Sequence, residues 1–223
     1  MKTLEKSLIS IKTDISRMAS IVMDMIRNST EALFKRDIEL AKKVFEIDNE
    51  VDELEVLIEK KSIETIALYE PKAGDLRFII TALRIIVDIE RIGDLCAGIA
   101  KLALKLNELP QIKPYKDLPE MADKVINMLS DAISAYFLKN DKLAKDIIER
   151  DDEIDDLNYS INRELIEIVK ESQDKSEGAL YLMFVTKNLE RIADHCTNIA
   201  ELVIYMDTAQ IVKHANIDDV KIS

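Results

Sequence analysis

Glycine and proline are scarce in this chain of 223 residues, which contains four of each and no tryptophan. Because these two residues form many tight turns and interrupt helices, their scarcity favours long uninterrupted helices. The residues that dominate instead are Ala, Leu, Ile, Lys and Glu, a composition typical of helical proteins. The sequence therefore predicts an all-α fold. An apolar fraction of 48% is ample for the core of one large domain or two small ones.

Reactive groups and long apolar runs are also few. The chain has two histidines and two cysteines. It shows no nucleophile–base pair, no phosphate-binding glycine loop and no Cys/His zinc spacing, so an enzyme is not the first interpretation. No apolar run approaches roughly 18 residues, so no membrane insertion is expected. The N-terminal stretch mixes Lys and Glu with Leu and Ile, which is not the pattern of a secretory signal.

The charge balance narrows the range of partners. With 31 basic and 43 acidic residues, the formal net charge is −12. This charge argues against nucleic acid or an anionic membrane surface as the main partner, and it suits cations or basic protein surfaces. Cys96 and Cys196 occupy equivalent places on two apolar seams, which predicts buried free thiols in a reducing compartment such as the cytoplasm.

One stretch occurs twice, one hundred residues apart. Residues 90–100 read ERIGDLCAGIA and residues 190–200 read ERIADHCTNIA, with seven of eleven positions identical. This spacing predicts an internal duplication. Ile92 and Ile192 lie on the apolar seam of each copy, where three- and four-residue spacings alternate as in a buried helix. We therefore expect both isoleucines to be buried.

Each copy carries two carboxylates four residues apart, and a second acidic pair stands at matched positions upstream, 103 residues apart. On a helix, side chains with this spacing lie about 40° apart around the axis and about 6 Å apart along it, so each pair points at one spot. The predicted metal ligands are the eight carboxylates Asp48, Asp52, Glu90, Asp94, Asp151, Asp155, Glu190 and Asp194.

Carboxylates on neighbouring helices of a bundle are a common way to build a metal site, and oxygen ligands favour Mg, Mn or Fe. His195 could add a nitrogen ligand, which would admit Zn. A single acidic pair is usually solvated surface, but four pairs in matched places favour metal binding. Arg91 and Arg191 could pair with carboxylates across helices rather than bind a ligand.

Apolar periodicity predicts six helices, three in each half. Asp37 is expected to cap the second, and Pro71 with Gly74 to end it. Three of the four prolines fall in 107–119, the only convincing internal linker. The second half mirrors the first, with a three-residue deletion near 173–177. We therefore expect tandem three-helix bundles over 1–107 and 117–206, then a short polar tail over 207–223, with one helical turn around 210–214.

These motifs resemble those of the PhoU family. The resemblance rests on Pro71-Lys-Ala-Gly-Asp-Leu-Arg77, on Asp88-Ile-Glu-Arg-Ile-Gly-Asp94 and on 189–201, and it extends from about residue 10 to 206. It implies two similar three-helix bundles, frequent homodimers, and metal ions (Fe, Zn, Mn or Mg) held by the Asp/Glu-x-x-x-Asp pairs. The chain departs from the family at Thr208-Ala-Gln210, where glycine is frequent.

The resemblance also implies a function. Members of this family are cytoplasmic negative regulators of the phosphate-starvation response, and they link a phosphate ABC transporter to a sensor histidine kinase. Two classes of function stay open at this point. The first is a non-enzymatic signalling adaptor with metal at its acidic pairs, and the second is a carboxylate-bridged metalloenzyme.

Overall fold

The computed structural model describes residues 3–112 and 115–208, which include 207 and 208 by backbone only. Within these ranges the chain is helical and has no strand, so the predicted all-α fold is confirmed. The helical turn predicted around 210–214 lies outside the described residues. The helices are α1 (Leu4–Lys35), α2 (Ile38–Tyr69), α3 (Ala73–Asn107), α4 (Leu118–Leu138), α5 (Asp141–Glu149), α6 (Asp151–Glu171) and α7 (Ser176–Thr208), with a 3-10 turn at Gln173–Lys175.

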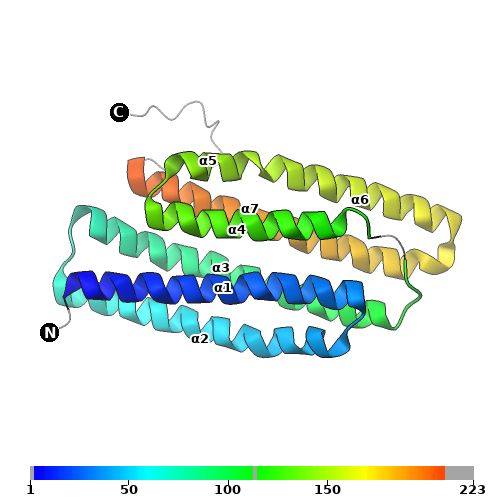
Figure 1. Cartoon of the computed structure of the whole chain (residues 1–223), viewed down its shortest axis with the longest axis horizontal. Helices are drawn as coiled ribbons and strands as arrows, with labels where there is room; N and C mark the ends of the chain where they lie inside the picture. The colour runs from blue at the N-terminus through cyan, green and yellow to red at the C-terminus, as the bar shows by residue number, and fades with distance from the viewer. Residues whose placement is uncertain (1–2, 113–114, 209–223) are drawn as a thin grey trace.

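The helices form two bundles that share one long central contact. Helices α1, α2 and α3 pack on one another, and α4, α5 and α6 pack around α7 in the same way. Helices α3 and α7 run side by side in opposite directions through the middle of the molecule (Figure 1). Helix α1 of the first bundle also contacts α4 of the second. The tandem three-helix repeats are thus packed side by side, and each repeat helps to bury the other.

The first helix–helix connection of each repeat is built in the same way, with a capped second helix. The side chain of Asp37 accepts a hydrogen bond from the backbone N–H of Leu40 at 3.0 Å, as expected for an N-cap. In the second repeat Asn140 does the same for Leu143 at 3.1 Å. The residue before each cap has a positive φ, which lets the chain reverse in two residues.

The second repeat differs from the expected pattern at Arg150. The counterpart of α2 is interrupted there, which gives α5 and α6 instead of one helix. The Arg150 Nη2 atom donates to Asp131 Oδ2 at 2.7 Å, so the break also ties α4 to the α5–α6 junction. Asp151 and the two acidic residues after it then fill the first turn of α6, where the helix dipole favours negative charge.

The connection between the repeats is packed against both of them. Arg36, just after α1, donates from Nε to Asn107 Oδ1 at 3.1 Å and from Nη2 to the carbonyl of Leu109 at 2.9 Å. Ile112 is buried, and Leu118 opens α4 as a buried residue. The linker that the prolines predicted is therefore held in place at both ends.

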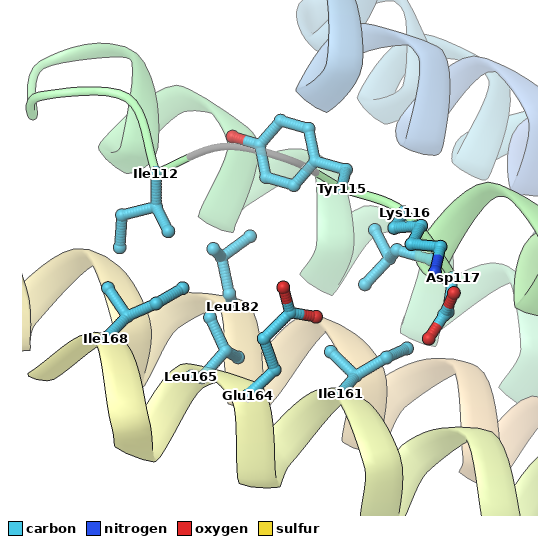
Figure 2. Close-up of a pocket in the computed structure, with 10 residues that line it drawn as sticks. Ile112, Tyr115, Lys116, Asp117, Ile161, Glu164, Leu165, Ile168 and Leu182 are labelled. Atoms are coloured by element: carbon cyan, nitrogen blue, oxygen red, sulfur yellow. The ribbon is translucent and has the colours of Figure 1, made fainter.

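A small cavity lies beneath this connection. In Figure 2, Ile112 points down toward α7, while Glu164 of α6 points up toward the linker. The volume of the cavity is about 20 Å³, enough for about one water molecule. A substrate of several atoms does not fit there, so this cavity is no candidate active site.

The buried positions follow the predicted seams. Ile92, Ile192, Cys96 and Cys196 are fully buried, and both thiols are free, as expected. Tyr136 of α4 donates its hydroxyl to the carbonyl of Phe78 in α3 at 2.9 Å, which satisfies a polar atom inside the joint between the repeats. Among the residues placed, no helix is both long and apolar enough to cross a membrane.

Candidate functional site

The first acidic cluster forms where α2 and α3 lie side by side. Asp48 and Asp52 come from α2, and Glu90 and Asp94 from α3. Partial burial, followed by the charges of Asp52 and Asp94, raises the pKa of Asp48 from its ordinary value of 3.8 to about 6. Carboxylates that raise one another's pKa in this way share a small volume. Three of the four carboxylates predicted for the first repeat thus lie near enough for their charges to act on one another.

Glu55 belongs to this cluster, although it is not among the eight carboxylates that the repeated spacing predicts. Burial is the main cause that raises the pKa of Glu90, and the charges of Asp94, Glu55 and Asp52 add to it. The pKa of Glu55 is raised in turn, first by burial and then by Asp52. Its spacing from Asp52, three residues further along the same helix, was the available signal.

The second cluster repeats the first where α6 and α7 meet. Burial, then the charges of Asp194, Asp155 and Glu190, raises the pKa of Asp151 from 3.8 to about 7. The pKa values of Asp155 and Asp194 are also raised, in both cases mainly by burial and then by Glu190. The charges of the four carboxylates predicted for the second repeat therefore act on one another as well. Each of them is as exposed or half-buried as its counterpart in the first repeat.

Basic side chains approach the rim of both clusters. Arg91 lies 3.1 Å from Asp94 and 3.4 Å from Glu90, both on its own helix. This pairing within α3 differs from the pairing across helices that was predicted. Lys187 forms the matching ion pair with Glu190 on α7. Because both basic side chains are more than half exposed, each can swing away when a cation competes for the carboxylates.

The clusters suit a hard cation in their donor chemistry. They supply anionic oxygens only, and partial burial makes their mutual repulsion costly until a positive charge offsets it. Gly93 lets α3 pack closely against α2, because a Cβ there would lie 3.2 Å from Asp48 Oδ1. In the described part of the chain, however, no group of three or more His, Cys, Asp or Glu side chains already forms a metal-ligating set. Metal binding would therefore require these side chains to adopt other rotamers.

His195 has a partner of its own. Its Nδ1 lies 2.9 Å from Asp88 Oδ1, and both side chains are mostly buried between α7 and α3. The amide of Asn198 also donates to Asp88, at 3.4 Å. This contact joins the two repeats and uses one ring nitrogen. Only Nε2 is left for the metal-ligand role that the sequence suggested.

A pH dependence follows from the two carboxylates with the most raised pKa. Because Asp48 and Asp151 bind a proton more tightly in the folded protein, metal-free protein should lose stability as the pH rises from about 4 to 7. Both groups are partly exposed, so we expect a combined effect of about 1–2 kcal/mol after solvent screening.

The pH-dependent loss of stability can be measured by urea denaturation in the presence of chelator at pH 5 and pH 7.5. The comparison is between the wild type and the variant Asp48→Asn/Asp151→Asn. The variant lacks both titrating groups, so its free energy of unfolding should fall less over this interval. Parallel pH profiles for the two proteins would contradict the assignment.

Comparison with known proteins agrees with this architecture. The family model described as the PhoU domain matches the chain twice, over residues 15–103 and 118–203. The "Phosphate-specific transport system accessory protein PhoU homolog" of Aquifex aeolicus is 41% identical over 216 residues, covering 97% of this chain and 98% of that protein. The first such homolog of Thermotoga maritima is 35% identical over 210 residues, covering 94% and 90%.

Solved structures agree with the sequence matches. The crystal structure of PhoU from Pseudomonas aeruginosa superposes with a TM-score of 0.87 at 29% identity, covering 93% of this chain and all of that one. The phosphate transport system regulatory protein PhoU from Streptococcus pneumoniae gives 0.86 at 27% identity, covering 95% of this chain and all of that one. The duplicated helical architecture and the sequence identity over nearly the whole chain lead to one conclusion: the chain belongs to the PhoU family.

Proposed function

We propose that this protein is a cytoplasmic accessory regulator of phosphate uptake, which represses the phosphate-starvation response when phosphate is ample. The observation that carries this proposal is the double match to the PhoU domain, together with relatives named as phosphate-specific transport system accessory proteins at up to 41% identity. The acidic surface, with a net charge of −12, suits contact with basic protein surfaces.

In this proposal the protein acts by binding rather than by catalysis. Its partners are a phosphate ABC transporter and a sensor histidine kinase, and it self-associates as a homodimer. The two acidic clusters hold Fe, Zn, Mn or Mg, which offsets the repulsion among carboxylates such as Asp48 and Asp151. No observation favours the alternative of a carboxylate-bridged metalloenzyme.

A complementation experiment tests this function. The gene would be expressed in a bacterium that lacks its own PhoU-family regulator and carries a reporter of the phosphate response. We expect reporter activity in phosphate-rich medium to fall at least tenfold. The control is the same chain with Ile92→Asp, which should unfold because an unpaired charge is placed in the core. Wild-type protein that accumulates normally but leaves the reporter fully active would refute the proposal.

A further inference from the structure

The second helix is continuous in the first repeat and broken in the second. Helix α2 runs unbroken through Asp48, whereas α5 and α6 together take its place in the second repeat (Figure 1). Asp151, the counterpart of Asp48, is therefore the first residue of a helix. The first turn of a helix frays, and its N–H groups have no partners within the helix. The backbone of α6 thus fixes Asp151 less firmly than α2 fixes Asp48.

Arg150 is the residue at which the helix breaks. Its backbone N–H donates to the carbonyl of Asp146 at 3.1 Å, and this bond ends α5. The carbonyl of Arg150 accepts from the backbone N–H of Glu153 at 3.2 Å, and this bond belongs to the first turn of α6. The position of Arg150 therefore sets where α6 begins, and Asp151 with it.

The side chain of Arg150 fastens this junction to the two helices before it. Its Nη2 atom donates to Asp131 Oδ2 of α4 at 2.7 Å, and its Nε atom lies 3.2 Å from Asp146 Oδ2 of α5. Because the guanidinium group is planar and rigid, contacts with two carboxylates fix its orientation. The Arg150 side chain is only 27% exposed, so solvent screens its contacts less than those of a surface ion pair. We call these two contacts of Arg150 the junction tie.

The junction tie lies close to the second acidic cluster. Burial raises the pKa of the Cys196 thiol on α7, the charge of Asp151 raises it further, and the charge of Arg150 lowers it. The guanidinium group and the Asp151 carboxylate therefore both act on the same buried thiol. Helix α7 also carries Glu190 and Asp194, so a shift of the junction would move Asp151 relative to the other carboxylates of the cluster.

The first repeat has no counterpart of the junction tie. The residues that stand 103 positions before those of the tie carry no matching charges; they are Asn28, Lys43 and Ile47. Isoleucine cannot form an ion pair, and the unbroken α2 needs none, because backbone hydrogen bonds on both sides hold Asp48 in place. Of the two repeats, the tie thus occurs in the one whose upstream acidic pair begins a helix.

We propose that Arg150 is the positioning residue of the second cation site: its contacts with α4 and α5 hold Asp151 where it can share a cation with the carboxylates of α7. The inference rests on the metal binding included in the proposed function, and it adds a residue that is not itself a ligand. Residues that orient metal ligands in this way typically contribute about 10–100-fold to metal affinity. The charge of Arg150 alone would act in the opposite direction, because a positive charge weakens the binding of a cation. The sign of the effect therefore separates positioning from charge.

The test measures Mn²⁺ binding by calorimetry in the full chain carrying Glu90→Gln/Asp94→Asn, which leaves only the second cluster intact. The tie variant, Asp131→Asn/Arg150→Ile, takes the residues of the first repeat and leaves the net charge unchanged. We expect the tie variant to bind Mn²⁺ more weakly by about tenfold or more. Arg150→Ile alone should also weaken binding, although it removes a positive charge. Arg150→Lys, which can still pair with Asp131, should retain most of the affinity.

Two controls isolate the junction tie. Lys124→Met/Glu153→Gln removes another ion pair between α4 and the first turn of α6, 2.6 Å long, and also leaves the net charge unchanged. Both of these side chains are more exposed than those of the ion pair with Asp131, so this variant should keep its Mn²⁺ affinity within about twofold. In the chain carrying Glu190→Gln/Asp194→Asn, where only the first cluster is intact, the tie variant should bind Mn²⁺ unchanged.

Three outcomes would overturn the proposal. Unchanged or tighter Mn²⁺ binding by the tie variant would mean that Arg150 positions nothing. An equal loss in the Lys124→Met/Glu153→Gln control, or a loss at the first cluster, would show a general loss of stability. Absence of Mn²⁺ binding while Arg150 is intact would refute the inference together with the metal binding in the proposed function, whereas repression in the reporter strain tests the regulatory role separately. Circular dichroism establishes that each variant is folded during the titration, and Arg150→Ile with Arg150→Lys decides the question if the tie variant does not fold.

Discussion

Replacement of Ile92 or Ile192 by alanine is expected to lower the free energy of unfolding by about 2–5 kcal/mol. Both side chains are fully buried, and they lie midway along α3 and α7, where the repeats share their core. Loss of a methyl and an ethyl branch there removes buried packing atoms from α3 or α7, the two helices that join the bundles. Single alanine variants should therefore unfold cooperatively at lower urea concentration, without a separate transition for one repeat.

The matched control is Ile80→Ala on the same helix. Ile80 is 42% exposed and faces away from the core, so its replacement should cost less than about 1 kcal/mol. Urea denaturation followed by circular dichroism measures all three variants. If Ile92→Ala cost as little as Ile80→Ala, the buried face of α3 would have been assigned wrongly.

The double substitution Glu90→Gln/Asp94→Asn should abolish metal binding in the first repeat and leave the second repeat loaded. A hard cation needs anionic oxygens, and these changes remove two of them while preserving size and helix character. The second cluster draws its ligands from α6 and α7, so it should be unaffected. Metal content of protein purified without chelator should fall by half. The fold should survive, because Asp94 is among the charges that raise the pKa of Asp48.

The reciprocal variant, Glu190→Gln/Asp194→Asn, provides the control and should lose the other half of the metal. In cells, both variants should express phosphate-response genes despite ample phosphate if metal supports signalling. Full metal content in either variant would mean that its carboxylates are solvated surface only. Loss of metal with intact repression would separate the metal from signalling and place the regulatory surface elsewhere.

Helix periodicity and cap chemistry allowed much of the fold to be predicted. The Asp37 cap and the seam through Ile92 depend on neighbours within two helical turns, and the structure has both. The break at Arg150 was not predicted, because its ion pair with Asp131 joins residues from different helices. The same holds for the packed linker at Ile112, whose burial depends on the second repeat. Local patterns contain no information about such distant partners.

The candidate site, like the fold, was predicted where it depends on local spacing and missed where it depends on side-chain contacts. The matched spacing in the sequence was enough to predict that Asp48 lies near Asp94 and that Asp151 lies near Asp194, since each pair lies on adjacent helices of one repeat. Arg91 was expected to reach across helices, but it pairs along its own helix, a choice that depends on rotamers rather than on spacing. These metal ligands themselves remain a prediction.

The contact between His195 and Asp88 shows that the two repeats of this chain can differ in sequence at matched positions. In a symmetric dimer of identical repeats, this pair would occur twice, but here leucine stands at position 95 and asparagine at 188. A single covalent chain can thus specialise one half without changing the other. The two acidic clusters differ in this way, because Asn158 stands in the second repeat at the position of Glu55 in the first and carries no carboxylate. In the proposed function, two sites of unequal charge would fill at different cation concentrations, so one molecule would respond to metal over a wider range than two identical sites would allow.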